Sequence, residues 1–230
     1  MSSANAQSIS ITVANEQQVS GLLLVPPKAR AVYVMAHGAG AGMTHSFMAA
    51  IAEGLAERDI ATLRYQFLSM EQGSRRPDPP KLAHAAVRAA VEEAARRLPG
   101  VPLFAGGKSF GGRMTSQAQA AAPLTGGRGL VFLGFPLHPP GKPSNERAQH
   151  LSEVTVPMLF LQGTRDELAD LALLQPVCRE LGARATLKLF KDADHSFHVP
   201  ARSGRKDSEV REELLDTMVG WLDEVIASNA

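Results

Sequence analysis

Short apolar runs alternate with longer helical segments along nearly the whole chain of 230 residues, and this alternation restricts the fold more than any other feature. The runs that predict strands are 8–13, 19–25, 31–36, 60–65, 102–105, 129–135, 157–162 and 185–190. Helical spacing of apolar residues covers 45–58, 80–98, 109–122, 169–181 and 208–227. Unbroken apolar strands are buried on both faces, and strand–helix alternation implies parallel strands joined by crossovers. We therefore predict one α/β domain over residues 1–230, with a mostly parallel sheet of about seven to eight strands and helices on both faces.

A glycine-rich stretch at 104–114, FAGGKSFGGRM, follows one of the predicted strands and contains Ser109. Gly107, Lys108 and Ser109 resemble the end of a phosphate-binding loop, G-x-x-x-x-G-K-[ST]. That motif requires a glycine at position 102, where this chain has Pro102, and most of the residues after it belong to the predicted strand. Too little loop remains to enclose a phosphate, so the sequence argues against a nucleotide-binding loop.

The same stretch matches G-x-S-x-G, the turn that presents a nucleophilic serine between a strand and a helix. Gly107 and Gly111 occupy the two glycine positions, and Lys108 is the variable residue before Ser109. Glycine-rich chains contain this short pattern by chance, so a plain turn is the alternative. Partner residues elsewhere in the chain must decide between the two.

A serine hydroxyl becomes a nucleophile when a histidine accepts its proton and an acid orients that histidine. With this motif the expected chain order is serine, acid, histidine, each after a strand. Asp166 follows the predicted strand 157–162, and His195 follows the predicted strand 185–190. We predict a Ser109–Asp166–His195 triad. Taken alone, each residue has a plainer interpretation, Asp166 as a helix cap and His195 as an ordinary loop residue. The alternative acids are Glu167, Asp192 and Asp194.

An oxyanion hole needs backbone N–H groups aimed at the oxygen on which charge develops. The residue after the nucleophile, Phe110, supplies one donor. The loop after the predicted strand 31–36, which reads HGAGAG, supplies the other, and we predict Ala39 with Gly40 as the alternative. We expect His37 to hold this loop rather than to transfer protons.

These segments together resemble the α/β-hydrolase superfamily: HGAG at 37–40, GKSFGG at 107–112, GTRDEL at 163–168 and DHSF at 194–197. More narrowly, the chain resembles the dienelactone-hydrolase-related branch, which includes proteins similar to a hydrolase-like subunit of a chromatin-regulating complex. LRYQF at 63–67 and RRPDPP at 75–80 add to that resemblance. Dienelactone hydrolase itself uses a cysteine nucleophile, where this chain has Ser109. Many relatives carry a lid after the sixth strand, but residues 136–156 leave room for only a short helix, so we expect an open site with little or no lid.

The leading prediction is a serine hydrolase that cleaves a carboxylic ester or thioester and needs no metal or cofactor. The alternatives are a non-catalytic hydrolase-like scaffold, marked by a displaced histidine or a blocked oxyanion loop, and a peptidase or amidase on the same fold. Five side chains are candidates for lining the pocket, with packing or a surface position as the alternative: Arg64, Gln66, Phe67, His138 and Phe197.

Composition limits the partners. The net charge is +1 and no basic pair grows into a cluster, so we expect a small-molecule acyl substrate and neither nucleic acid nor a membrane surface. The first residues lack the apolar run of a signal peptide or anchor, which predicts a cytoplasmic protein. The single cysteine, Cys178, excludes an intramolecular disulfide and is expected to be a buried thiol. The sequence carries no indication of oligomeric state.

Overall fold

An eight-stranded sheet forms the centre of the structure, a computed structural model that describes residues 5–13 and 16–228. The strand order is β1-β2-β4-β3-β5-β6-β7-β8. The strands are β1 (Gln7–Thr12), β2 (Gln18–Leu24), β3 (Ala31–Ala36), β4 (Ile60–Tyr65), β5 (Leu103–Lys108), β6 (Gly127–Leu133), β7 (Met158–Gly163) and β8 (Ala185–Phe190). β2 is antiparallel to both of its neighbours, and every other neighbouring pair is parallel. Residues 1–4 lie outside the described residues. They belong to the N-terminal stretch in which the sequence predicts neither a signal peptide nor an anchor.

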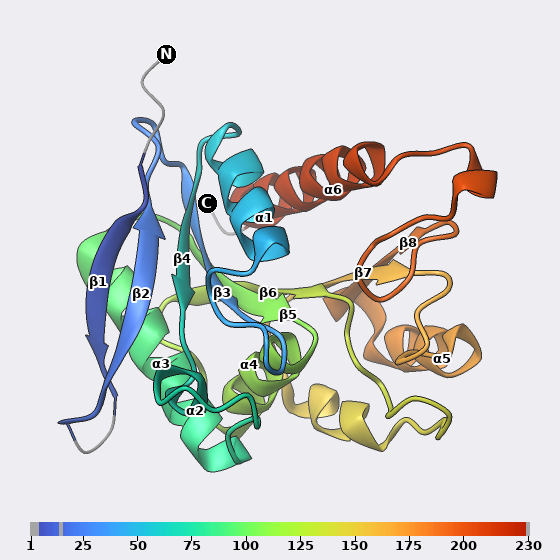
Figure 1. Cartoon of the computed structure of the whole chain (residues 1–230), viewed down its shortest axis with the longest axis horizontal. Coiled ribbons are helices and arrows are strands. Elements are labelled where there is room, and N and C mark those ends of the chain that lie inside the picture. Colours follow the sequence, from blue (N-terminus) through green and yellow to red (C-terminus); the bar gives the residue numbers. More distant parts are fainter. Residues whose placement is uncertain (1–4, 14–15, 229–230) are drawn as a thin grey trace.

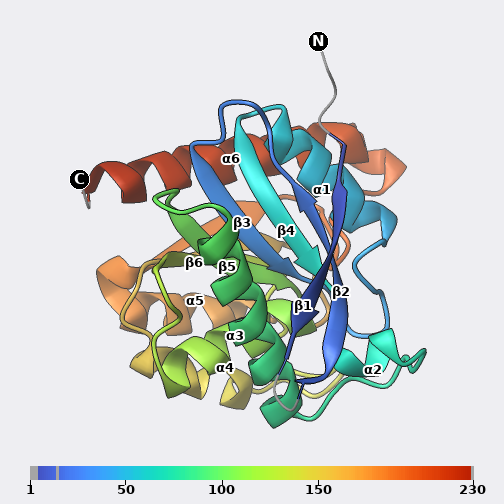
Figure 2. The ribbon, with the colours of Figure 1, turned by 90° about the vertical axis from the view of Figure 1, so that its left-hand side faces the viewer.

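Helices cover both faces of the sheet, as Figures 1 and 2 show. α1 (Ser46–Ala56) and α6 (Asp207–Ser228) lie on one face. α3 (Pro80–Arg97), α4 (Phe110–Ala121) and α5 (Leu171–Leu181) lie on the other. The remaining helical turns are α2 (Leu68–Glu71), η2 (Glu146–Glu153), η3 (Gly182–Arg184) and η4 (Ala201–Ser203).

Two hydrophobic clusters, one on each face, hold the layers together because successive strand residues point to opposite sides. On β7, for example, Phe160 packs in the cluster beneath α3, α4 and α5, whereas Leu159 and Leu161 pack beneath α1 and α6. Each fully buried side chain of this size contributes about 1.5–3 kcal/mol. Burial on both faces therefore explains why the central strands are continuous apolar runs.

The predicted strands and long helices all occur, and the differences lie at their boundaries. β5 continues to Lys108 instead of ending at Ala105, because Gly106 and Gly107 pair with Met35 and Ala36 of β3. This pairing leaves no loop before Ser109, as expected from the absence of a phosphate-loop glycine. The short helix α2 was not predicted, since a single turn shows too little periodicity.

The chain between β6 and β7 contains the short helix η2, which packs against α4 and α5. This agrees with the expectation that residues 136–156 hold a short helix and no lid domain.

Within the part of the chain that the structure describes, no helix has both the length and the apolar character needed to span a bilayer.

Candidate active site

Ser109 lies at the sharp junction between β5 and α4 in a strained backbone conformation. Its φ of 50° and ψ of −117° fall where non-glycine residues are rare. The backbone holds it there from both sides: its N–H donates to the Leu133 carbonyl at 3.2 Å, and its own carbonyl accepts from the N–H of Arg113 at 3.1 Å. Strain of this kind costs of order 1–3 kcal/mol and persists where the surrounding structure imposes it.

Gly111 explains how the turn can be so tight. A Cβ at this position would lie 2.5 Å from the carbonyl oxygen of Ala36, which is the last residue of β3. The first turn of α4 therefore lies directly against the end of the neighbouring strand, and only a residue without a side chain fits. The glycine in the G-x-S-x-G pattern thus serves close packing of helix on strand, as the sequence indicated.

His195 and Asp166 meet at the ends of two neighbouring strands. The Nδ1 atom of His195 lies 2.7 Å from Oδ2 of Asp166, whose side chain is fully buried. Because a carboxylate only accepts, Nδ1 carries the proton and Nε2 is left as the acceptor. Asp166 is itself fixed by Gln162, whose Nε2 donates to Oδ2, and by the N–H of Leu168, which donates to Oδ1 at 2.8 Å.

Among the described residues, the hydrogen bonds of the His195 ring include one to Asp166 and none to Asp194, Asp192 or Glu167. Asp194 accepts the N–H groups of Ser196 and His198 at 2.8 and 3.0 Å and so closes the turn that carries His195. Glu167 is exposed. The cap of α5 is Asp170, which accepts from the N–H of Ala172 at 2.8 Å, so Asp166 is not needed as a helix cap.

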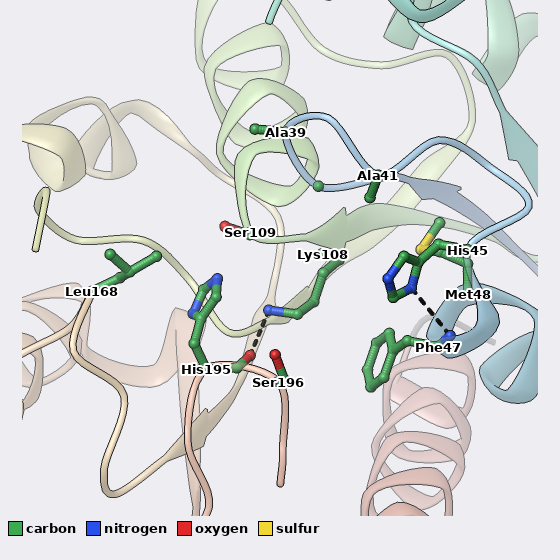
Figure 3. Close-up of a pocket in the computed structure, with 11 residues that line it drawn as sticks. Ala39, Ala41, His45, Phe47, Met48, Lys108, Ser109, Leu168, His195 and Ser196 are labelled. Atoms are coloured by element: carbon green, nitrogen blue, oxygen red, sulfur yellow. Dashed lines mark hydrogen bonds between the residues drawn. The ribbon is translucent and has the colours of Figure 1, made fainter. Parts of the chain in front are cut away.

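Ser109 and His195 line one cavity of about 380 Å³, a volume typical of small-molecule sites. Figure 3 shows Ala39, Ser109, Leu168 and His195 along one side of it. The other lining residues are Gly38, Ala41, His45, Phe47, Met48, Lys108 and Ser196. The wall is therefore largely apolar, and no acidic side chain occurs among its described lining residues.

Of the two predicted oxyanion donors, Ala39 lines this cavity, and Phe110 directly follows Ser109, which also lines it. Phe110 is the first residue of α4, a position whose N–H has no partner within the helix. Ala39 lines the cavity, whereas Gly40 lies on the other side of the loop, where a Cβ would be 3.3 Å from the Arg75 carbonyl oxygen. The position of these two residues favours Ala39 over Gly40 as the second donor.

His37 holds the loop, as its position suggested. It is buried, its Nδ1 lies 2.7 Å from the Gly38 carbonyl oxygen, and its Nε2 accepts from the N–H of Phe67 at 3.1 Å. Because Nε2 accepts a backbone N–H, it carries no proton, so the ring is neutral and Nδ1 is the donor. Burial lowers the pKa of His37, partly offset by the Gly38 carbonyl and by Asp78. Both ring nitrogens are thus engaged by the backbone.

The five side chains weighed for the pocket wall are all outside the set of described residues that line the cavity. Arg64 and Gln66 instead contact the backbone of Met43, through Nη1 to its carbonyl oxygen at 3.3 Å and Oε1 to its N–H at 2.9 Å. His138 accepts from the N–H of Asp170 at 2.9 Å. The rings of Phe67 and Phe197 pack against His37 and Phe47. The packing alternative holds for all five.

Lys108 is the residue whose importance the sequence interpretation missed. Its side chain lines the cavity, and its Nζ donates to the main-chain carbonyl of His195 at 2.6 Å. Burial lowers the pKa of Lys108 to about 8, although Asp166 and Asp194 favour the charged form. The motif treats this position as variable, so no spacing signal could reveal the contact.

Comparison with known proteins agrees with this architecture. The family model described as "Alpha/beta hydrolase domain" matches residues 29–223. A dienelactone hydrolase from Anabaena variabilis is 20% identical, with 97% of this chain and 99% of that chain covered and a TM-score of 0.78. An α/β serine hydrolase without a lid from Xanthomonas campestris is 21% identical, with 97% and 94% covered and a TM-score of 0.69. An esterase from Pyrococcus furiosus is 15% identical, with 96% and 93% covered and a TM-score of 0.75.

At these identities the solved structures establish a shared fold, and the family model covers most of the chain. The resemblance predicted from the four sequence segments is confirmed: the chain belongs to the α/β-hydrolase domain family.

Proposed function

We propose that the chain is a serine hydrolase that cleaves a carboxylic ester or thioester through a Ser109–His195–Asp166 triad. The observation that carries this proposal is a convergence of three strand ends on one cavity. A serine held at φ 50° at the start of α4 shares that cavity with a histidine whose Nδ1 lies 2.7 Å from a buried carboxylate.

In this mechanism Nε2 of His195 accepts the proton of Ser109 as Oγ attacks the acyl carbon. The carbonyl electron pair moves to oxygen, and the N–H groups of Ala39 and Phe110 stabilise the resulting oxyanion. Collapse of the tetrahedral intermediate expels the alcohol or thiol, which takes the proton from His195. Water then attacks the acyl-enzyme by the same steps in reverse and releases the acid. Asp166 keeps the imidazole in the required tautomer and stabilises the imidazolium.

The size and lining of the cavity are consistent with a small acyl substrate. Its apolar wall is formed by Ala39, Ala41, Phe47, Met48 and Leu168. Such a wall favours an uncharged, apolar acyl chain short enough for a volume of about 380 Å³. A graded panel of acyl esters, thioesters and amides measures both the length preference and the choice between esterase, thioesterase and amidase activity.

The non-catalytic alternative is expected to show a displaced histidine or a blocked oxyanion loop. In contrast, His195 and Ala39 both line the cavity that contains Ser109. This arrangement favours catalysis over a purely structural role.

Fluorophosphonate labelling tests the nucleophile directly, because the probe reacts with an activated serine whatever the natural substrate. We expect the wild type to be labelled at Ser109 and Ser109→Ala to remain unlabelled while its circular dichroism is unchanged. Ser196→Ala, which removes the other serine among the described lining residues, is the matched control and must still be labelled at Ser109. A wild type that is folded but unlabelled contradicts the proposed function.

A further inference from the structure

The ammonium group of Lys108 contacts the backbone of His195, the histidine of the proposed triad. Nζ donates to the carbonyl oxygen of His195 at 2.6 Å, drawn as a dashed line in Figure 3. Within residues 5–13 and 16–228, no other donor reaches this carbonyl, and Lys108 forms no ion pair within 4.0 Å. The lysine therefore links the last residue of β5 to the loop that follows β8.

The surroundings of Gly134 show that the side chains of Lys108 and His195 lie close together. A Cβ at this position, just after β6, would lie 3.1 Å from Nζ of Lys108 and 3.3 Å from Nδ1 of His195. Gly134 has a φ of +71°, a left-handed conformation that favours glycine. Nζ also lies 5.9 Å from the centre of the Phe197 ring. The ends of β5 and β6 and the loop after β8 thus meet around the lysine.

We propose that Lys108 is a positioning residue that holds the main chain of His195. The end of β5 then sets the positions of both the nucleophile, Ser109, and its base, His195. This inference rests on the proposed function, because it assigns Lys108 a part in the triad's geometry. Lys108 immediately precedes Ser109, and therefore a shift of β5 moves the serine and the histidine anchor together. A displacement of about 1 Å in a catalytic group can cost about 100-fold in rate, which is the reason to fix both from one strand.

The charge on Lys108 strengthens the link, since a hydrogen bond from an ionised donor is roughly twice as strong as a neutral one. The titratable groups around it are Asp166, Asp194 and His195 from the loops after β7 and β8, with His45 from the start of α1 on the same cavity. As pH rises through about 8, Lys108 loses its proton and the link weakens.

Steady-state kinetics of Lys108→Met against a short-chain ester is the first test. We expect kcat to fall by about 10- to 100-fold while KM stays within about twofold, because the histidine is misplaced but the substrate contacts remain. Lys191→Met, which alters an exposed lysine of the same loop, is the matched control. A raised KM with unchanged kcat assigns Lys108 to substrate binding and overturns the proposal, as does wild-type kinetics.

The pH profile separates positioning from a merely structural role. Lys108→Cys treated with 2-bromoethylamine restores the side chain as thialysine, a less basic amine, and Cys178 is buried. We expect treatment to restore kcat and to move its alkaline limb to lower pH than in the wild type. Restored kcat with an unmoved alkaline limb refutes a role for the lysine charge.

Amide hydrogen exchange tests the anchor without any catalytic readout. In Lys108→Met at pH 7 we expect faster exchange in the loop 191–199, including the N–H groups of Asp194 and Phe197, which are hydrogen-bonded within the turn. Unchanged exchange overturns the proposal whatever the activity. If the wild type is not labelled by fluorophosphonate but exchange in Lys108→Met is still faster than in the wild type, the proposed function is wrong and the anchoring role of Lys108 stands.

Discussion

Replacing Lys108 by methionine has a thermodynamic consequence that can be worked out from the structure. Burial lowers the pKa of this lysine from 10.5 to about 8. Below pH 8 both folded and unfolded chains carry the charge, and the folded state bears the full cost of burying it. Between about 8 and 10.5 only the unfolded chain is protonated, so unfolding takes up a proton and raising the pH stabilises the fold.

The magnitude follows from the two pKa values. Each unit corresponds to about 1.4 kcal/mol, and integrating from pH 7 to pH 10 gives about 2.5 kcal/mol of stability regained by the wild type. Methionine has no proton to lose. The free energy of unfolding of Lys108→Met relative to the wild type is therefore expected to fall by about 2.5 kcal/mol over this interval.

Urea unfolding at pH 7, 8, 9 and 10, followed by circular dichroism, measures this difference. Burial raises the pKa of Tyr33 and Tyr65, whose ionisation in the unfolded chain destabilises both proteins alike and cancels in the comparison. Lys191→Met is the control, since that side chain is exposed. A difference between Lys108→Met and wild type that stays constant from pH 7 to 10 would refute the lowered pKa of Lys108.

Three other substitutions test the site. Gly111→Ala is expected to destabilise the protein by about 3 kcal/mol, measured by urea unfolding, because its Cβ would lie 2.5 Å from the Ala36 carbonyl oxygen; a neutral effect contradicts the close packing. Asp166→Asn should lower kcat by roughly 10³–10⁴-fold without unfolding, and near-normal turnover would assign the acid elsewhere. Ser109→Gly should have a free energy of unfolding about 1 kcal/mol higher than Ser109→Ala, measured by urea unfolding, because glycine relieves the strain at φ 50°. Equal free energies of unfolding would exclude that strain.

Chain order and strand ends were enough to predict that Asp166 and His195 lie together and that Ser109 and His195 line one cavity. Asp166 and His195 are far from Ser109 in sequence, yet parallel strands bring their carboxyl ends to one edge of the sheet. Asp192 and Asp194 precede His195 on its own loop, so strand-end position already favoured Asp166 over them. Asp194 has the same chemistry and lies nearer to His195 in the chain, but its carboxylate is used by the backbone of its own turn.

The cavity wall could not be predicted in the same way. Phe47 and Met48 line it because of the rotation of α1 about its axis, which depends on packing against α6 rather than on the apolar period alone. Lys108 contacts a residue 87 positions later through a main-chain carbonyl, a partner that every residue type possesses. Side-chain chemistry therefore carried no signal for that contact, whereas Ser109, Asp166 and His195 could be proposed as a triad because they differ chemically from their surroundings.

The segment between β6 and β7 offers a place to remodel specificity. None of its described residues lines the cavity, and its tip at Gly141 is exposed, with open space around a Cβ at that position. Loop tips of this kind tolerate inserted domains. We expect that a cap domain grafted at Gly141 changes which substrates enter, while the proposed triad residues keep their original scaffold.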